Sequence, residues 1–453
     1  MSCGFQDACV TADDVFCCFI NRSTILYNSH DRYYKSLGRV TTMKETEKKE
    51  LIFRCGRVFS PAAPINKLDL FAGRLKQIEK VSDAINTRGQ HAVIFGERGV
   101  GKTSLANILQ DMLVSQGVLV VKVNCQDDNY QGAWRKAFAE ITIDVEEDVM
   151  GITSRKKINA FTADRLFEGE FGPGEVRRFF QRVYNSQEVV TIFDEFDRLL
   201  NGKTQRLFAD TIKDLSDNSI PTTLVMVGVA GDVDDLIKEH ASIDRALVQV
   251  QMPRMPGSEL TDIMKKALGS LAMTIQPDGM DLVVLLSQGL PHYTHLLGKE
   301  SAIATLKEGR TKISLADVRK GIKNAVENSM ESVQNSYQKA IRSQRKETLF
   351  REVLLACALA EVDDQGYFAS ADVRAPLCKI TGKSYDIPNF SQHLDKFSSD
   401  QGRGPVLERS GTSRRFRFRF VNPLLQPYVI MRGLADNVVT GDVLELLQKK
   451  QRI

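Results

Sequence analysis

Residues 96–103, GERGVGKT, match the pattern G-x-x-x-x-G-K-[ST] of a phosphate-binding loop. Glycines at this spacing let the backbone turn its N–H groups toward a phosphate chain, and the following helix adds the positive end of its dipole. Lys102 is expected to contact the β- and γ-phosphates, and the Thr103 hydroxyl is expected to bind Mg²⁺. The predicted ligands are therefore ATP and Mg²⁺. The predicted nucleotide contacts are Gly96, Glu97, Arg98, Gly99, Val100, Gly101, Lys102, Thr103 and Ser104.

A second group of reactive side chains follows the apolar segment of VVTIFDEFD, residues 189–197. An apolar strand that leads directly into carboxylates is expected where the carboxyl edge of a sheet faces a metal and an attacking water. Asp194 would hold Mg²⁺ directly or through a water. Glu195 would polarise the water that attacks the γ-phosphate, because phosphoryl transfer depends mainly on positioning and charge stabilisation. The alternative is a strand followed by a solvated acidic helix start.

The elements around these motifs alternate between strand and helix. HAVIF at 91–95 has the length and apolar character of a buried strand, and residues 104–117 show helical spacing. The other predicted strands are 118–124, 188–193, 222–230 and 246–252. Strands that alternate with helices indicate a parallel sheet covered on both faces. The predicted fold class is α/β, with a three-layer P-loop NTPase core.

These motifs resemble those of AAA+ ATPases, in particular the origin-recognition and initiator branch, together with related bacterial transposition-type and STAND-like ATPases. LFAGRLKQIEK at 70–80 is similar to the F-x-G-R-x-x-E element that lies against the adenine in that branch. In ASIDRALVQVQMPRM at 241–255, Arg245 takes the position of a family arginine before the last strand. The resemblance implies an arginine finger that reaches a neighbour's γ-phosphate in a homo-oligomer. The alternative is a surface arginine paired with Asp244 or Glu239.

Two positions depart from the family's pattern. The end of the fourth strand, which often carries a polar sensor residue, has Gly231 followed by Asp232. GLPHYTHLLG at 289–298 is similar to the family's G-x-P-R helix start, with His292 at the position of the second sensor's arginine. His292 is thus predicted to face the nucleotide. Both changes favour a nucleotide-controlled switch over a fast motor.

The region after the core is predicted to form a helical lid at 257–340, with Ser314 and Asp317 as a capping box. Lids of this type close over the nucleotide and convert phosphate binding into a change of shape. Residues 341–435 show three helical segments and then a two-strand hairpin, the order of the winged helix that the initiator branch carries at this place. A tail helix is predicted within 436–453.

The hairpin sequence RRFRFRF at 414–420 places Phe416, Phe418 and Phe420 on one face and arginines on the other. Residues 401–420 hold six arginines and one acid, so the local charge is +5. This charge indicates contact with the phosphate backbone of DNA. The alternative is a solvated arginine face or one that pairs with an acidic protein partner, since winged helices also bind proteins. The predicted DNA contacts are Arg414, Arg415, Arg417 and Arg419.

The composition is that of an ordinary globular chain, with 453 residues, 42% hydrophobic residues and a net charge of +4. This length accommodates roughly two to four domains, and the small net charge does not by itself indicate a polyanionic partner. The apolar run VFCCFI at 15–20 is too short for a signal peptide or a membrane span, so a cytoplasmic protein without membrane contact is expected. The eight cysteines lack zinc-site spacing and are expected to be free thiols.

The N-terminal extension is predicted to cover 1–66, before a nucleotide-binding core at 67–256. Its first 42 residues are rich in Cys, Ser and Tyr and are followed by Met43. They are either a translated upstream segment, with the true start at Met43, or a genuine extension. The function predicted for the whole chain is a DNA-associated ATPase. The alternatives are a regulator that docks a protein partner and an ATP-binding subunit without turnover.

Overall fold

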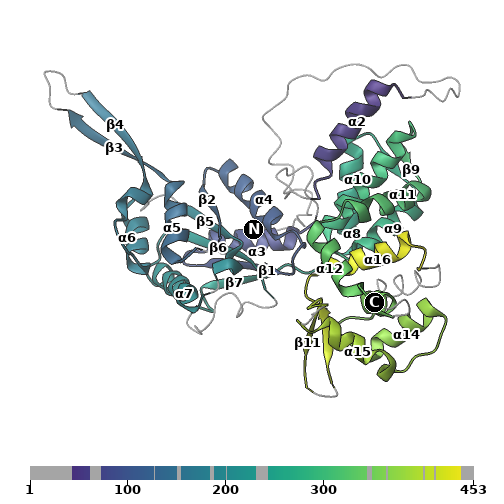
Figure 1. Ribbon diagram of the computed structural model, residues 1–453. Helices are drawn as coiled ribbons and strands as arrows, with labels where there is room; N and C mark the ends of the chain where they lie inside the picture. Colours follow the sequence, from purple (N-terminus) through teal and green to yellow (C-terminus); the bar gives the residue numbers. More distant parts are fainter. Residues whose placement is uncertain are drawn as a thin grey trace, which may run out of the picture. The chain divides into compact units, whose positions relative to one another are not determined.

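The structure is a computed structural model (Figure 1). It describes residues 43–61, 73–126, 128–149, 155–183, 188–199, 201–230, 243–343, 349–363, 366–400, 403–412 and 415–439. Residues Met43–Ile453 form one compact unit. The segment before Met43, the sensor positions Gly231 and Asp232, Arg414 and the predicted helix in the tail lie outside the described residues.

A five-stranded parallel sheet forms the centre of the first half of the chain. Its strands are β1 (His91–Gly96), β2 (Leu119–Asn124), β5 (Val189–Asp194), β6 (Thr222–Val229) and β7 (Leu247–Gln251). All five predicted strands are thereby confirmed. The strand order is β2-β5-β6-β1-β7, so β6 separates the phosphate-loop strand from the acidic strand. Because all strands run in one direction, the phosphate loop and Asp194 both lie at the carboxyl edge of the sheet.

Helices cover both faces of this sheet, as predicted. Alternate residues of β1 enter different cores: Ala92 and Ile94 pack in one cluster, and Val93 and Phe95 pack in the other. The first cluster includes side chains from α3 (Leu75–Asn86) and α4 (Lys102–Ser115). The second includes those of α5 (Tyr130–Ala139), α6 (Pro173–Val183) and α7 (Gly202–Asp217). The three-layer arrangement therefore follows from the period-two alternation of the strands.

An antiparallel ribbon between α5 and α6 is absent from the predicted strands. It consists of β3 (Thr142–Val149) and β4 (Arg155–Thr162), paired from Thr142 with Thr162 to Val149 with Arg155 (Figure 1). The short 3-10 helix η2 (Ala163–Leu166) follows it, and η3 (Phe196–Leu199) follows β5. Within the described part of the chain, the ribbon strands pair only with each other, and their sequence is rich in charged residues. They therefore lack the continuous apolar run that marks a buried strand.

A group of helices follows β7. It comprises α8 (Gly257–Ser270), α9 (Pro277–Ser287), α10 (Pro291–Lys307), α11 (Leu315–Glu327) and α12 (Glu331–Ile341), with the short strands β8 (Thr274–Ile275) and β9 (Lys312–Ile313). The capping box of Ser314 and Asp317 at the start of α11 is confirmed. The early helix α2 (Glu45–Val58) packs against α10, where a Cβ on Gly298 would lie 2.5 Å from Phe59. A residue larger than glycine at position 298 would therefore require Phe59 and Met264 to shift.

The C-terminal part combines helices with a small antiparallel sheet. Its elements are α13 (Phe350–Leu359), β10 (Phe368–Ala369), α14 (Ser370–Thr381), α15 (Ile387–Phe397), β11 (Leu407–Ser410), β12 (Arg417–Phe420) and α16 (Leu425–Ala435). The sheet order is β10-β12-β11, one strand more than the predicted hairpin. β10 is only two residues long, too short for a period-two pattern to be read. Phe418 and Phe420 are buried as predicted, and Phe416 packs partly buried against the same core.

Two predictions about the chain as a whole can be compared with the structure. Among the described residues, no helix combines the length and apolarity needed to cross a membrane. Four described cysteines are free thiols, as predicted: Cys55, Cys125, Cys357 and Cys378.

Candidate functional site

The phosphate loop connects β1 to α4 and has the backbone geometry that its glycines predict. Gly99 and Gly101 have φ values of 90° and 98°, in the left-handed region that side chains disfavour. Gly101 directly precedes α4, and no described side chain caps this helix start. The first N–H groups of α4 are thus available to an anion, and the helix dipole favours one there.

Lys102 lies inside this loop rather than in solvent. Its Nζ donates to the carbonyl oxygens of Gly96 at 3.0 Å and Glu97 at 2.8 Å, and the residue is 8% exposed. Burial lowers the pKa of Lys102 to about 8, while the nearby carboxylates of Asp197, Asp194 and Glu97 oppose this shift. The ammonium is therefore held by backbone carbonyls at the position where a phosphate could replace them.

The two predicted metal ligands lie next to each other. The Thr103 hydroxyl donates to Asp194 Oδ1 at 3.3 Å, and the N–H of Glu195 donates to the same oxygen at 2.9 Å. Asp194 is 2% exposed at the end of β5. A hydroxyl and a carboxylate oxygen are ligands of the kind that Mg²⁺ prefers, and Mg²⁺ commonly takes its other ligands from phosphates and water. This pair therefore fits Mg²⁺ bound together with ATP.

Glu195 has an unusual backbone conformation and a partner that the sequence did not reveal. Its φ is 55°, uncommon for a residue with a side chain. Its Oε2 lies 3.1 Å from Arg198 Nε, and both side chains are about half exposed. The Glu195 carboxylate could polarise a water in one of two ways. It could first separate from Arg198, or it could contact the water and Arg198 at the same time.

A cavity of about 510 Å³ brings most of the predicted site together, a size typical of small-molecule sites. The predicted residues that line it are Arg98, Gly99, Gly101, Lys102, Thr103, Ser104, Asp194, Glu195 and His292. The lining that the sequence did not indicate includes Ser60, Pro61, His295, Met330 and Leu424. These residues come from distant segments. His295 alone had a local signal, since it lies three residues after His292 and thus on nearly the same helix face.

His292 lines the cavity but does not replace the charge of an arginine. Its Nδ1 lies 2.7 Å from the carbonyl oxygen of Pro61. Burial lowers the pKa of His292, and the positive charge of Arg98 acts in the same direction. The imidazole is therefore held neutral near pH 7, and it joins the segment before the core to the start of α10.

Three of the predicted loop residues do not line the cavity. The side chain of Glu97 turns away and pairs with Arg254, with Oε2 and Nε 2.8 Å apart. Val100 is fully buried, and its carbonyl oxygen accepts from Arg74 Nη2 at 3.2 Å. Arg74 belongs to the predicted F-x-G-R-x-x-E element. Gly96 contributes its carbonyl to Lys102.

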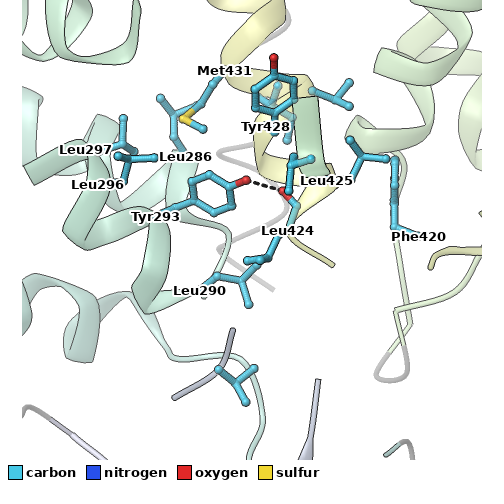
Figure 2. Packing of buried hydrophobic residues seen from close by; sticks show 14 of the residues in the cluster. Leu286, Leu290, Tyr293, Leu296, Leu297, Phe420, Leu424, Leu425, Tyr428 and Met431 are labelled. Atoms are coloured by element: carbon cyan, nitrogen blue, oxygen red, sulfur yellow. Dashed lines mark hydrogen bonds between the residues drawn. The ribbon is translucent and has the colours of Figure 1, made fainter. Parts of the chain in front are cut away.

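The C-terminal part contacts the phosphate loop directly. A Cβ on Gly99 would lie 2.8 Å from Leu424 Cδ2, and Arg254 donates to Gln426 Oε1 at 3.0 Å. Figure 2 shows Leu424 near Leu290, with its carbonyl accepting from the Tyr293 hydroxyl at 2.5 Å. The loop, the start of α10 and the start of α16 therefore form one packed unit.

Arg245 is exposed, as an arginine finger requires. Its side chain is 80% exposed, and Nη2 lies 3.0 Å from Asp217 Oδ1. This partner is neither Asp244 nor Glu239, the two acids considered from the sequence. Arg245 does not line the cavity of its own chain, so a role there would need a second copy of the chain.

The positive charge of the C-terminal hairpin is partly neutralised by acids. Arg417 pairs with Asp363, and Arg419 Nη2 lies 2.7 Å from Glu408 Oε2. Arg409, on β11, pairs with Asp395 in the same way. Asp363 and Asp395 lie outside residues 401–420, so the local count of +5 overstates the free charge. Arg415 is exposed.

The buried ammonium of Lys102 predicts a pH-dependent affinity for ATP. With a pKa of about 8, the group is protonated below that pH and deprotonated above it. Phosphate binding favours the protonated form, so binding above this pH must take up a proton. We expect the affinity for MgATP to fall by roughly ten-fold per pH unit above about pH 8. Titration of a fluorescent ATP analogue measures this. A flat profile would contradict it, and Lys102→Arg, whose guanidinium keeps its proton, should lose the slope.

A family model matches the part of the chain that forms the parallel sheet and the phosphate loop. Residues 85–237 match the family model described as an AAA domain. No curated protein matches the chain. The solved Walker-type ATPase of Pyrococcus abyssi is similar at 12% identity, with 82% of this chain and 99% of that chain covered and a TM-score of 0.48. The family match, the parallel sheet and the phosphate loop identify the α/β part as a P-loop core of the AAA type.

Two other solved structures show a comparable likeness. The ORC2 protein of Aeropyrum pernix is 14% identical, with 88% of this chain and 98% of that chain covered and a TM-score of 0.45. Cdc6p of Pyrobaculum aerophilum is 14% identical, with 85% and 99% covered and a TM-score of 0.42.

Proposed function

We propose that this chain is a Mg²⁺-dependent ATPase of the AAA type that works as a conformational and oligomerisation switch on DNA. The observation that carries the proposal is the meeting of Lys102, Thr103 and Asp194 at one cavity, at the carboxyl edge of a parallel sheet. Calorimetric titration of folded protein with ATP tests it. Magnesium-dependent binding of adenine nucleotide is expected, and its absence would refute the proposal.

The predicted site residues at the cavity have proposed roles in this reaction. The loop N–H groups and Lys102 bind the phosphates, and Thr103 and Asp194 hold Mg²⁺. The metal would neutralise charge that develops on the phosphates. Glu195 orients and polarises the attacking water. Two features support slow turnover: Glu195 is paired with Arg198, and His292 supplies no positive charge.

The switch depends on the contact between the phosphate loop and the C-terminal part. Leu424 packs against Gly99, and Glu97 joins the loop to Arg254, which in turn binds Gln426. Phosphates that draw Lys102 away from the carbonyls of Gly96 and Glu97 would move this loop. Because packed side chains shift between discrete arrangements, a small movement of the loop would reposition α16.

Arg245 is proposed to complete the site of a neighbouring copy of the chain. The proposal is supported by its exposure and by its position before β7. We expect Arg245→Ala to leave ATP affinity unchanged and to lower turnover by roughly 10³-fold under conditions where the protein assembles. Phosphate release measured beside the sedimentation profile checks this. An equal loss in a strictly monomeric sample would contradict a finger role.

Binding of DNA is proposed for the C-terminal part, read as a winged helix at 341–435. The order of its helices and strands and the exposed Arg415 support this proposal. Titration with duplex DNA at increasing salt tests it, because each neutralised phosphate steepens the salt dependence. Absence of salt-dependent binding, with and without ATP, would refute it.

A second candidate function is a nucleotide-dependent regulator whose C-terminal part docks a protein partner. The observation that favours it is the pairing of Arg409, Arg417 and Arg419 with acids, which leaves less charge for phosphates. Under this alternative, ATP binding persists and DNA binding is absent. The same salt titration therefore separates the two functions.

A further inference from the structure

A lysine from the neighbouring strand lies against the metal-binding carboxylate. Lys122 is on β2, and its Nζ is 3.2 Å from Asp194 Oδ2. The two side chains are 13% and 3% exposed. The Lys122 ammonium also donates to Asn107 Oδ1 on α4. None of the predicted roles at the site uses this lysine.

The strand register and the helix spacing place Lys122 next to the two proposed metal ligands. Asn124 of β2 is paired with Asp194, so Lys122, two residues earlier, lies on the same face of the sheet. Asn107 follows Thr103 by four residues, so it lies one turn further along the same face of α4. Lys122 thus contacts both elements that carry the proposed metal ligands, and its strand β2 lies on the other side of β5 from β1, the strand that leads into the phosphate loop.

The two oxygens of Asp194 have different surroundings. Oδ1 accepts from the Thr103 hydroxyl and from the N–H of Glu195. Oδ2 is buried without a hydrogen-bond partner in the described part of the chain, so Lys122 acts on it as a charge rather than through a directed bond. A buried carboxylate without a counter-charge is costly, and Lys122 supplies that charge. It also favours the orientation in which Oδ1 faces Thr103.

Lys122 and Lys102 have separate tasks in this arrangement. Lys102 is held by the loop carbonyls at the cavity, where phosphates would bind. Lys122 does not line the cavity, so a nucleotide bound there would not contact it directly. A fixed ammonium next to Asp194 repels a divalent cation that approaches the same carboxylate. Phosphate oxygens would offset this repulsion, because they add negative charge and metal ligands.

We propose that Lys122 is a positioning residue that serves as the resident counter-cation of Asp194 and keeps divalent metal out of the nucleotide-free site. The metal then enters together with the triphosphate. This inference rests on the proposed nucleotide site and adds to it the order in which metal and nucleotide bind.

Titration with Mn²⁺, followed by electron paramagnetic resonance, tests the inference. In the absence of nucleotide, wild-type protein should bind Mn²⁺ weakly, and Lys122→Met should bind it roughly ten-fold or more tightly, because the repelling charge is gone. Lys122→Arg, which retains the charge, should behave like wild type. Lys136→Met is the matched control, since it removes a lysine paired with Asp128 at 2.6 Å on a different element.

Unchanged Mn²⁺ affinity in Lys122→Met, or the same gain in Lys136→Met, would overturn the inference. Circular dichroism establishes that each variant is folded. Should Lys122→Met not fold, Lys122→Gln replaces it and should likewise gain Mn²⁺ affinity. The wild-type protein gives a second test, because it should bind Mn²⁺ more tightly with ATP than without it. Wild-type protein that binds Mn²⁺ at least as tightly without ATP would overturn the inference. Because the titration of the variants contains no nucleotide, its failure is distinct from a failure to bind ATP.

Discussion

Lys102→Ala is expected to abolish ATP binding at micromolar concentrations while leaving the fold intact. Bonds from this ammonium to phosphates are charge-assisted, and their loss costs about 3 kcal/mol or more, roughly 100-fold in affinity. In the structure, Lys102 binds only two loop carbonyls among the described residues. These contacts lie within the loop, and Lys102 is not part of the apolar clusters on the two faces of the sheet, so the fold is expected to persist without it.

Calorimetry with MgATP measures the affinity, and thermal unfolding without nucleotide measures stability. Lys80→Ala is a suitable control, because Lys80 is an exposed lysine on α3 of the same core. It should leave both quantities unchanged. Micromolar affinity retained in Lys102→Ala would contradict the proposed phosphate contact. A large drop in melting temperature would instead show that Lys102 stabilises the empty loop.

Glu195→Gln is expected to lower the rate of phosphate release by roughly 10²- to 10⁴-fold, the usual range for loss of a general base. ATP affinity should change little, because glutamine keeps the size of the side chain and Glu195 is proposed to act on the water. Because Glu195 is paired with Arg198, the change in turnover distinguishes a catalytic carboxylate from one that only holds Arg198. A carboxylate that serves only to hold Arg198 would not change turnover when replaced.

Steady-state phosphate release under saturating MgATP checks this prediction. Glu188→Gln is the matched control, because Glu188 is exposed and directly precedes β5, at the end opposite to Asp194. It should release phosphate at the wild-type rate. Equal and negligible release by wild type and Glu195→Gln would favour an ATP-binding subunit without turnover.

Much of the core was predictable because its signals are local. A strand buried on both faces must be apolar at nearly every position, and β1 and β5 are fully buried. The phosphate loop was predictable for a similar reason, since its glycines, Lys102 and Thr103 are adjacent in the chain. The capping box of Ser314 and Asp317 also depends on neighbouring residues alone.

Features that depend on distant segments were not predictable in this way. The order of the strands, which puts β6 between β1 and β5, depends on pairing between segments far apart in the chain. The charge of the C-terminal hairpin was overestimated because Asp363 and Asp395 reach it from other elements. Pattern reading counts charges along the chain, whereas Coulomb energy depends on distance in space.

The sequence by itself determined that a phosphate-loop motif and an acidic strand end are present, because each consists of consecutive residues whose backbone geometry is local. Only the tertiary structure decided that Lys122 lies beside Asp194, that Leu424 packs on Gly99, and that His292 is neutral. These properties arise from burial and from contacts between segments far apart in the chain. Burial and these long-range contacts are set by the packing of the folded chain, so they cannot be inferred from a short stretch of residues.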